Sequence, residues 1–395
     1  MRELADMGDF RQQQTAEDKG SNSAATDQEP IQDNSAASDS FHTSAKSRSY
    51  RWAHVNPPPF DTQNDFPLHH LDPCPDELRN KCFLTNNRDY FRSASAVIFH
   101  LSDISVKDLP DSERRSREQR YIFFSHEASA LQVRNLDDIA PNFFNWTMTL
   151  RLDSDIPWPY SFFVQDKNSN SWKVKSDHDR ELNIALGTKL KLAVWMASNC
   201  RTHSQRELYI NALKAAGLKI DIYGNCGNLT CPKSQLYECY MRLGKQYKFY
   251  FALENSVCKD YTSEKSLLAM DGFMVPIVLN RAIASLSLPN GSFIALDDFE
   301  SPQALIDLLS TLDRNDALYK SYFDWRLQGW NRVHYFPGKH FSMCGLCEKL
   351  LKERNVGDNN SRKIIPKSYT NIKRWWFDGG QCKQGFAATL LKKHL

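Results

Sequence analysis

Hydrophobic and polar positions divide the chain into a polar beginning and a longer part that can form cores. Large apolar residues are scarce over residues 1–50, where Ser, Ala, Gln, Asn and Asp dominate. A segment of this kind cannot bury enough apolar surface to fold, so a disordered tail is expected. Short apolar runs between polar loops follow at Ala96–His100 and Tyr121–Ser125. Such runs are typical of strands inside a sheet.

From about residue 188 the pattern becomes a regular alternation of strands and helices. Lys189–Met196 and Leu218–Tyr223 are apolar enough for strands. A helix is expected between them at Ser204–Ala216, with Gly217 as its C-terminal cap. Another helix is expected from Ser301 to Leu312. Strands that alternate with helices of this length predict parallel βαβ units.

The segment Tyr247–Leu279 contains the polar residues that point to chemistry. It reads as an aromatic strand, a polar loop, a helix and a second apolar strand. The candidate residues on the loop and the first helical turn are Glu254, Asn255, Tyr261, Glu264 and Lys265. Ligands of open α/β sheets bind at this carboxyl edge of a strand. A helix N-terminus with a lysine can hold a phosphate, and an adjacent glutamate can accept ribose hydroxyls, which suits a sugar nucleotide.

Composition and charge limit the class of protein. The chain has 395 residues, enough for two domains and a tail, and its net charge of +3 is too small to indicate nucleic-acid binding. No apolar run approaches the roughly 18–20 residues needed to cross a bilayer. The N-terminus also lacks the residue order of a signal peptide. The tail is therefore interpreted either as a stem whose membrane anchor is absent from this chain or as an ordinary cytosolic tail.

Cysteines and sequons favour a secretory compartment. The ten cysteines are an even number, and those in polar, loop-like surroundings suited to disulfides are Cys74, Cys82, Cys226, Cys231 and Cys239. Cys344 and Cys347 form a CxxC without the second ligand pair of a zinc site, which favours a disulfide or a structural pair. Candidate glycosylation positions are Asn145, Asn228, Asn290 and Asn359, of which Asn145 lies in the most apolar surroundings.

Other motifs of nucleotide and hydrolase chemistry are weak or missing. Asp153 and Asp155 have the D-x-D spacing that holds Mn²⁺ in some sugar-nucleotide enzymes, but loop capping is favoured because they lie far in sequence from the candidate phosphate site. The prolines of residues 153–160 exclude a helix there and predict an exposed aromatic loop. The sequence contains no GxGxxG, GxxxxGK[ST] or GxSxG.

Several motifs in a fixed order carry a family resemblance. They are NWTMTLRLDSDIPWPY (145–160), ASNCRTHSQRELYI with LKIDIYGNCG (197–227), ENSVCKDYTSEK (254–265), PNGSFIALDDFESPQALIDLL with YKSYFDWR (289–326) and CGLC (344–347). Together they resemble the α1,3-fucosyltransferases, glycosyltransferase family ten. The resemblance covers roughly residues 74–350. It departs from the family at Ser263, where the family usually has threonine, and at Ser266-Leu267 and Asn280-Arg281.

The resemblance implies an α/β protein of the GT-B type, with two Rossmann-like domains that face each other across a cleft. The implied division is an acceptor-side domain over residues 51–187, a GDP-fucose-binding domain over 188–340, and a C-terminal tail over 341–395 that packs back on the body. This organisation agrees with the strand–helix alternation found from residue 188 onward.

The resemblance also implies roles for single residues. Lys265 and Arg206 would contact the pyrophosphate, Glu264 the guanosine ribose, and Tyr261 the phosphate or base, with Glu254 and Asn255 beside the donor sugar. Glu127 would be the general base, with a pKa raised by partial burial. His100, His126 and His203 are alternative bases, for which structural roles are expected.

The expected activity is inverting transfer of fucose from GDP-fucose to the 3-hydroxyl of GlcNAc in N-linked glycans. The core GlcNAc is favoured as acceptor, and an outer Lewis-type GlcNAc is the alternative. A second hypothesis is a catalytically silent glycan- or nucleotide-binding protein on the same fold. No cofactor is required, although the family allows stimulation by Mn²⁺. The Golgi lumen is the expected location, with membrane association through an anchor absent from this chain.

Overall fold

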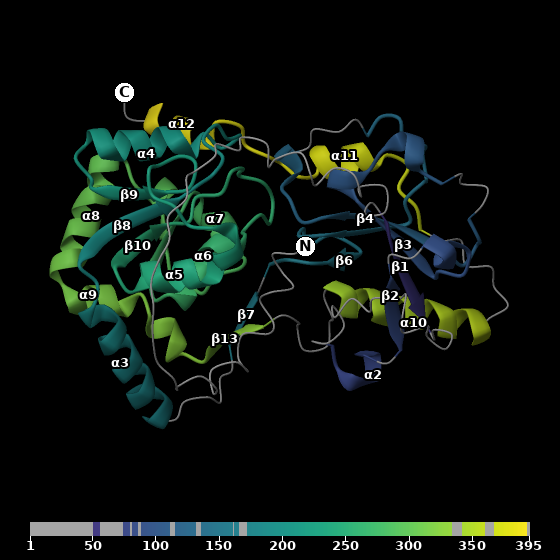
Figure 1. The fold of residues 1–395 in the computed structure, drawn as a ribbon, viewed down its shortest axis with the longest axis horizontal. Coiled ribbons are helices and arrows are strands. Elements are labelled where there is room, and N and C mark those ends of the chain that lie inside the picture. The colour runs from purple at the N-terminus through teal and green to yellow at the C-terminus, as the bar shows by residue number, and fades with distance from the viewer. Residues whose placement is uncertain are drawn as a thin grey trace, which may run out of the picture.

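The chain forms two α/β domains that lie side by side (Figure 1). The structure, a computed structural model, describes residues 50–55, 74–79, 81–85, 88–110, 115–131, 136–160, 162–165, 172–333, 342–359 and 367–392. Each domain has a mainly or wholly parallel sheet, as the GT-B class requires. The tail expected to be disordered lies outside the described residues, except for Tyr50 at its end.

The N-terminal domain is built on a six-stranded sheet of order β2-β1-β3-β4-β5-β6. Strand β1 pairs antiparallel with β2 and β3, and the other pairs are parallel. The elements are β1 (Tyr50–Val55), α2 (Asp76–Arg79), β2 (Cys82–Thr85), β3 (Ala96–His100), β4 (Arg120–Ser125), β5 (Trp146–Thr149) and β6 (Ile156–Pro157).

The C-terminal domain has a five-stranded parallel sheet of order β12-β11-β10-β8-β9. Its elements are α3 (Trp172–Gly187), β8 (Lys191–Met196), α4 (Arg206–Ala215), β9 (Ile220–Tyr223), α5 (Leu236–Gly244), β10 (Tyr247–Phe251), α6 (Glu264–Asp271), β11 (Val275–Val278), α7 (Arg281–Ala284), β12 (Ile294–Ala295), α8 (Pro302–Arg314) and α9 (Asp316–Ser321). The predicted caps are confirmed: Gly217 has a φ of +97°, and the Ser301 side chain accepts a hydrogen bond from the Ala304 backbone.

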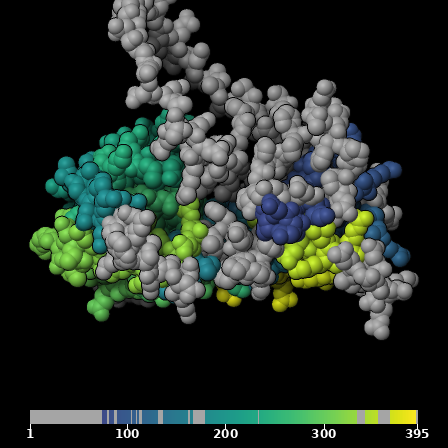
Figure 2. Space-filling model, turned by 90° about the horizontal axis from the view of Figure 1, so that it is seen from below, coloured from purple at the N-terminus to yellow at the C-terminus, as the bar shows by residue number. Residues whose placement is uncertain are grey.

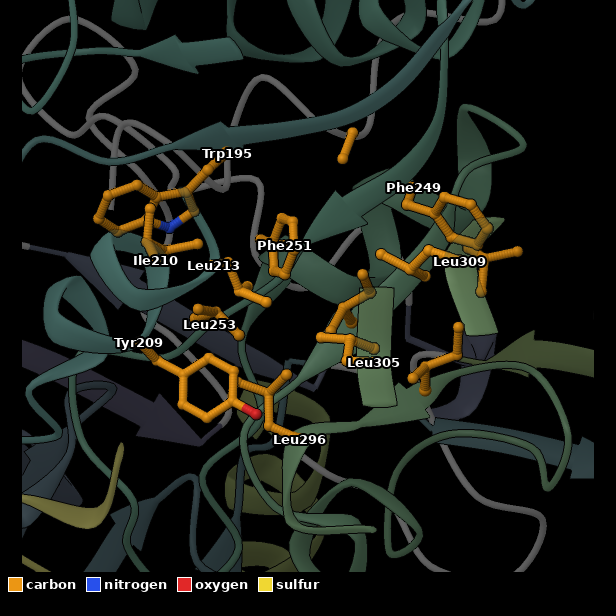
Figure 3. Packing of buried hydrophobic residues seen from close by; sticks show 14 of the residues in the cluster. Trp195, Tyr209, Ile210, Leu213, Phe249, Phe251, Leu253, Leu296, Leu305 and Leu309 are labelled. Atoms are coloured by element: carbon orange, nitrogen blue, oxygen red, sulfur yellow. The ribbon is translucent and has the colours of Figure 1, made fainter. Parts of the chain in front are cut away.

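Two cores cover the two faces of the C-terminal sheet. Trp195 of β8 and Phe249 and Phe251 of β10 pack against side chains of α4 and α8 on one face (Figure 3). On the other face Tyr250 of β10 packs against α5 and α6. Because successive residues of a strand point to opposite faces, a strand buried on both sides is mostly apolar or aromatic, as β10 is except at Lys248.

The C-terminal segment of the chain returns to the N-terminal domain and then leaves it again. Helix α10 (Ser342–Asn359) covers one face of the N-terminal sheet, and α11 (Ile372–Phe377) covers the other. In the space-filling view α10 lies beside α2 (Figure 2). Helix α12 (Phe386–Lys392) then packs beside α4 on the C-terminal domain (Figure 1). The segment over 367–392 therefore joins the two domains.

A short antiparallel pair also lies between the domains. Strand β7 (Phe162–Gln165) pairs with β13 (Trp330–Val333), so the chain enters and leaves the C-terminal domain at the same place (Figure 1). Helix α3 packs through Leu182 into the core of the C-terminal sheet. The second domain therefore includes α3, which the sequence division at residue 188 assigned to the first.

Candidate functional site

The topology of the C-terminal sheet marks one edge as the place for a ligand. From β8 the chain moves to β9 on one side, and from β10 it moves to β11 and β12 on the other. Where the strand order reverses in this way, the loops diverge at the carboxyl ends and leave a crevice. Arg206 begins α4 after β8, and Glu264 begins α6 after β10. The two helices bring the predicted cations and carboxylates to this edge.

Lys265 is held in a cluster of polar groups at the start of α6. Its ammonium donates to Ser263 Oγ at 2.8 Å, to Glu254 Oε2 at 3.0 Å and to Glu264 Oε1 at 3.3 Å. Glu254 in turn accepts from the Ser263 backbone at 2.8 Å and from the Ser263 hydroxyl at 2.6 Å. The Lys265 side chain is only 18% exposed, so the ammonium is part of the domain rather than a free surface charge.

Lys265 and Glu264 favour each other's charged forms. Burial acts to lower the pKa of Lys265, but the attraction of Glu254 and Glu264 outweighs burial and raises it. Burial acts in the opposite direction on Glu264, where the neighbouring ammonium outweighs it and lowers the pKa. Two carboxylates facing one ammonium leave a net negative charge, which a further cation must compensate.

Arg206 supplies that further cation beneath the cluster. Arg206 is 3% exposed, and burial lowers the pKa of its guanidinium, although Glu254 opposes this shift. The guanidinium donates to the carbonyl oxygens of Leu253 and, at 3.3 Å, Asn199. Its Nε finds no hydrogen-bond partner among the described residues. One donor of this buried cation thus has no partner in the described part of the chain.

A pocket next to the cluster contains further unpartnered polar atoms. Its empty space is about 310 Å³, open to solvent, and its lining includes Glu254, Tyr261, Ser256 and Ser266. The hydroxyls of Ser256 and Ser266 are buried, as is Asn255 Oδ1, and within the described parts of the chain none of the three has a hydrogen-bond partner. Buried polar groups of folded proteins are nearly always satisfied. Of these residues Ser256 and Ser266 line the pocket, so their hydroxyls are free to bind a ligand or ordered water there.

Glu127 of the N-terminal domain lies opposite this edge. It follows β4, and its Oε2 lies 3.5 Å from the Tyr261 hydroxyl, which belongs to the loop after β10. Glu127 keeps exposed surface, yet the surrounding protein still removes enough water from its carboxylate to raise its pKa; Lys265 opposes the shift, and Glu264 and Glu254 add to it. Burial also raises the pKa of Tyr261, so its hydroxyl stays protonated and can only donate to the carboxylate.

His126, the nearest alternative base, has a structural environment. Burial lowers its pKa to about 4, and its Nε2 lies 2.7 Å from the Trp158 carbonyl oxygen. Its ring stacks on Tyr160 at a centroid distance of 4.9 Å. Residues 153–160 are therefore no exposed aromatic loop: Ile156–Pro157 forms β6, and Trp158 and Tyr160 are half-buried around His126.

The D-x-D carboxylates are bound by cations of the protein itself. Asp153 accepts two hydrogen bonds from Arg151, at 2.9 and 2.7 Å, and one from Lys259 at 2.9 Å. Asp155 accepts from Lys367 and Tyr369, both at 2.7 Å. In the part of the chain that the structure describes, no group of three or more His, Cys, Asp or Glu could hold a metal ion.

All ten cysteines form disulfides, and the CxxC does not close on itself. The pairs are Cys74–Cys344, Cys82–Cys347, Cys200–Cys226, Cys231–Cys239 and Cys258–Cys382. Residues three apart on a helix share a face, so both cysteines of α10 can reach the same region: Cys344 pairs with Cys74, just before α2, and Cys347 pairs with Cys82 of β2. Sequence analysis did not single out Cys200, Cys258 or Cys382, and nothing in their local sequence distinguishes them.

The sequons differ in accessibility. Asn145 is 3% exposed, and its side chain is fully engaged: it donates to the Lys367 carbonyl and accepts from the Tyr121 backbone and from Arg115. It is therefore not a glycosylation site in the folded protein. Asn228 and Asn290 are exposed. Asn359 ends α10, and its side chain lies outside what the structure describes.

The helices were also compared with what a membrane span needs. In the described ranges, none is both long enough and apolar enough to cross a bilayer.

Sequence reasoning also missed the role of Ser263 in the Lys265 cluster. Its position directly before an acidic first turn is the signal of a helix N-cap, a role that Ser263 fills by accepting from the Lys265 backbone.

Comparison with known proteins gives the same result in both domains. A family model described as glycosyltransferase family 10 (fucosyltransferase) C-term matches residues 186–375, and one described as fucosyltransferase, N-terminal matches residues 47–161. The chain is 33% identical to alpha-(1,3)-fucosyltransferase fut-6 of Caenorhabditis elegans, over 81% of this chain and 79% of that protein.

Two other relatives are similar at the same level. Glycoprotein 3-alpha-L-fucosyltransferase A of Drosophila melanogaster is 32% identical over 76% of this chain and 55% of its own length. The gorilla 4-galactosyl-N-acetylglucosaminide 3-alpha-L-fucosyltransferase FUT5 is 38% identical over 69% of each chain. A crystal structure of an α1,3-fucosyltransferase with GDP-fucose matches 62% of this chain and 76% of its own, with 17% identity and a TM-score of 0.39, too low to support an argument.

Proposed function

Because the chain belongs to glycosyltransferase family 10, the fucosyltransferases, we propose that it transfers fucose from GDP-fucose to the 3-hydroxyl of GlcNAc in N-linked glycans. The enzyme is an α1,3-fucosyltransferase, as its relatives are. The reaction inverts the anomeric configuration, because the acceptor hydroxyl attacks the face of fucose opposite to the leaving GDP. The following assignments of residues belong to this proposal.

Glu127 is the general base of the proposed mechanism. It takes the proton of the acceptor hydroxyl as the bond to fucose forms. Burial raises the pKa of Glu127, which makes the carboxylate a better proton acceptor near neutral pH. Tyr261, held protonated, orients the carboxylate from the opposite domain. The observation that carries the proposal is the contact across the two domains between Glu127 and Tyr261, which belongs to the loop that leads into the Lys265 cluster.

Lys265 and Arg206 stabilise the leaving diphosphate. Charge develops on GDP as fucose departs, and preorganised cations lower the energy of that transition state. When the diphosphate binds, Lys265 exchanges a carboxylate partner for phosphate, and Arg206 offers its unpartnered Nε. Glu264, released from the ammonium, then accepts the ribose hydroxyls, while Glu254 and Asn255 lie beside the donor sugar.

No metal ion is required in this mechanism. The two cations supply the positive charge that Mn²⁺ supplies in other sugar-nucleotide enzymes. The D-x-D carboxylates are already neutralised by Arg151, Lys259 and Lys367, which argues against a metal site at that motif. Stimulation by Mn²⁺ acting on the diphosphate itself is compatible with the proposal, and titration with EDTA tests it.

The core GlcNAc of N-linked glycans is the proposed acceptor. The printed name of the Drosophila relative gives a glycoprotein activity, whereas the gorilla relative is named for a 4-galactosylated GlcNAc. The outer Lewis-type GlcNAc is the alternative.

A transfer assay with two acceptors tests the proposal. Purified protein is given GDP-fucose labelled with ¹⁴C together with a core glycopeptide or with N-acetyllactosamine. Preferred labelling of the glycopeptide supports the core acceptor, and preferred labelling of the disaccharide supports the outer one. Binding of GDP-fucose with no transfer to either acceptor supports the silent binding protein and overturns the proposal.

We also propose that the enzyme works in the Golgi lumen and is associated with the membrane. Five disulfides among ten cysteines fit an oxidising secretory compartment rather than the cytosol. Exposed Asn228 and Asn290 fit the same compartment. Fluorescence microscopy of the tagged protein against a Golgi marker checks this location.

A further inference from the structure

The loop between β10 and α6 is bound along its length by the C-terminal segment. The Lys259 backbone donates to the Gly380 carbonyl at 2.8 Å, and the Lys383 backbone donates to the Val257 carbonyl at 2.8 Å. The Cys258–Cys382 disulfide joins the two strands of chain between these bonds. The loop that contains Tyr261 is thus fixed to a segment that runs from α11 on one domain to α12 on the other.

Side chains tie the same loop directly to the N-terminal domain. Asp153, in the loop after β5, accepts from Lys259 at 2.9 Å and from the buried Arg151 in a bidentate pair. Arg151 donates in turn to the Trp375 carbonyl of α11 at 2.6 Å. The Asp260 carboxylate accepts from the Leu152 backbone at 2.9 Å. We call Asp153, Lys259 and Asp260 the interdomain clasp.

Asp260 has an unfavourable backbone conformation that its surroundings must stabilise. Its φ of +60° lies in the left-handed region, which residues other than glycine seldom adopt, although aspartate and asparagine tolerate it. It is nearly buried, and it immediately precedes Tyr261. The bond to Leu152 therefore fixes the direction in which the chain carries the Tyr261 side chain.

The residues that follow the base Glu127 also pack against the loop between β10 and α6 and against the C-terminal segment. Ala128, which follows it, packs in a small apolar cluster with Leu150, Cys258 and Tyr261. The chain at Gly380 approaches so closely that an added Cβ would lie 2.3 Å from the Ser129 Oγ. Residues on both sides of the domain junction are thus in direct contact beneath Glu127 and Tyr261.

We propose that the interdomain clasp positions Tyr261 against Glu127, so that Asp153, Lys259 and Asp260 are positioning residues for the transfer step. The inference rests on the proposed function, because it takes Glu127 as the base. It also gives the D-x-D motif a role: Asp153 joins the two halves of the site instead of holding a metal.

The clasp acts on transfer and not on donor binding. The Lys265 cluster is held by Glu254, Ser263 and Glu264, all within the C-terminal domain. Loss of the clasp leaves those bonds intact. The Glu127–Tyr261 contact, in contrast, depends on the relative position of the two domains. A misplacement of about 1 Å between reacting groups costs on the order of 100-fold in rate.

Substitutions at Asp260 and Lys259 test the proposal. Asp260→Ala is expected to lower kcat about 10- to 100-fold while calorimetry finds the affinity for GDP unchanged. Asp260→Asn is expected to restore kcat, because it keeps both the acceptor oxygen and the tolerance for positive φ. Lys259→Ala, at a half-exposed position, provides a milder variant should Asp260→Ala not fold. Lys373→Ala is the matched control, since it removes the exposed Lys373–Asp137 pair of the same segment.

A pH profile separates positioning from general damage to the fold. Burial raises the pKa of Glu127, so a loosened junction that admits water moves this pKa back toward its ordinary value. The base is active when ionised. The acid limb of kcat/KM is therefore expected to move to lower pH in Asp260→Ala and Lys259→Ala, but not in Lys373→Ala.

Three outcomes would overturn the clasp. They are an unchanged kcat in Asp260→Ala, a loss of GDP affinity as large as the loss of kcat, and the same effects in Lys373→Ala. Hydrogen exchange of residues 256–263 without substrate keeps this test separate from the proposed function. Faster exchange in Asp260→Ala, with α6 unaffected, supports the clasp as a junction even if the wild-type chain transfers no fucose. No change in exchange removes the clasp while leaving the fucosyltransferase proposal standing.

Discussion

At the scale of single residues, the site is governed by how charges are compensated. Two carboxylates, of Glu254 and Glu264, and two cations, of Lys265 and Arg206, form a largely buried set, and only some of its bonds can remain when a diphosphate binds. Removing one charge from such a set leaves its partner buried and uncompensated, which costs more than the lost contact alone. Substitutions here therefore report on the whole set.

Glu127→Gln is expected to lower kcat by about 10²- to 10⁴-fold, since the amide cannot accept the acceptor proton. GDP affinity should stay near that of the wild type. Wild-type kcat/KM should fall as pH drops through the pKa of Glu127, which burial places above the usual range of a glutamate. Steady-state kinetics and calorimetry measure both effects, and Glu181→Gln on the exposed face of α3 is the control. Full activity of Glu127→Gln would remove this residue from the mechanism.

Lys265→Ala is expected to cost about 2–4 kcal/mol of transition-state stabilisation and to weaken binding of GDP. The loss is enlarged because Glu254 and Glu264 then face the diphosphate without compensation. Lys265→Ala combined with Glu254→Gln should recover part of the GDP affinity, since it removes one repelling carboxylate. Calorimetry of the single and double variants measures this, and a double variant that binds GDP no better than Lys265→Ala contradicts the charge argument.

At the scale of elements, the sequence predicted the regular parts well. Helices α4 and α8 carried their own capping signals, and β10 was recognisable from its aromatic residues, four of its five. Strand β6 was missed because it has only two residues and contains Pro157, which is acceptable at the edge of a sheet but masks the strand pattern. Local sequence encodes elements, whereas it says little about two-residue strands that form only against a neighbour.

Gly380→Ala is the prediction that belongs to the turn between α11 and α12. An added Cβ would lie 2.3 Å from the Ser129 Oγ and 2.9 Å from the Trp376 carbonyl oxygen, so the turn or Ser129 must move. Overpacking of this kind costs about 1–3 kcal/mol. A lower Tm is expected in differential scanning fluorimetry. Gly187→Ala is the control, because its added Cβ meets nothing within 4 Å, and an equal loss of Tm there would rule out the steric cause.

At the scale of the whole molecule, the candidate site is assembled from segments that local patterns cannot join. Lys265 and Glu264 were found from a strand–loop–helix pattern, because they lie in one segment. Glu127 lies 134 positions from Tyr261 in sequence, and only the family resemblance pointed to it. The disulfides are similar: α10 bonds to cysteines 270 and 265 positions away, so the CxxC could not reveal its partners.

The two disulfides of α10 lead to a prediction about cooperativity between them. Both join the same two parts of the chain, so either one alone keeps the long loop closed. While one bridge remains, the other closes only a short loop of about eleven residues, made of the stretches 74–82 and 344–347. Its removal is expected to lower the free energy of unfolding by about 3 kcal/mol in the chain-entropy model. Removing the second releases a loop of about 265 residues, worth about 5 kcal/mol or more.

Unfolding in guanidinium chloride tests this with three variants, in which Cys74–Cys344, Cys82–Cys347 or both pairs are changed to serine. Each single-pair variant is expected to unfold at a slightly lower denaturant concentration, and the double variant to lose more than the two single losses combined. The donor-side residues lie in the other domain, so GDP affinity should not change in the single-pair variants. Simple additivity would mean that the bridges act by local packing, and that closure of the chain around α10 does not stabilise the N-terminal domain.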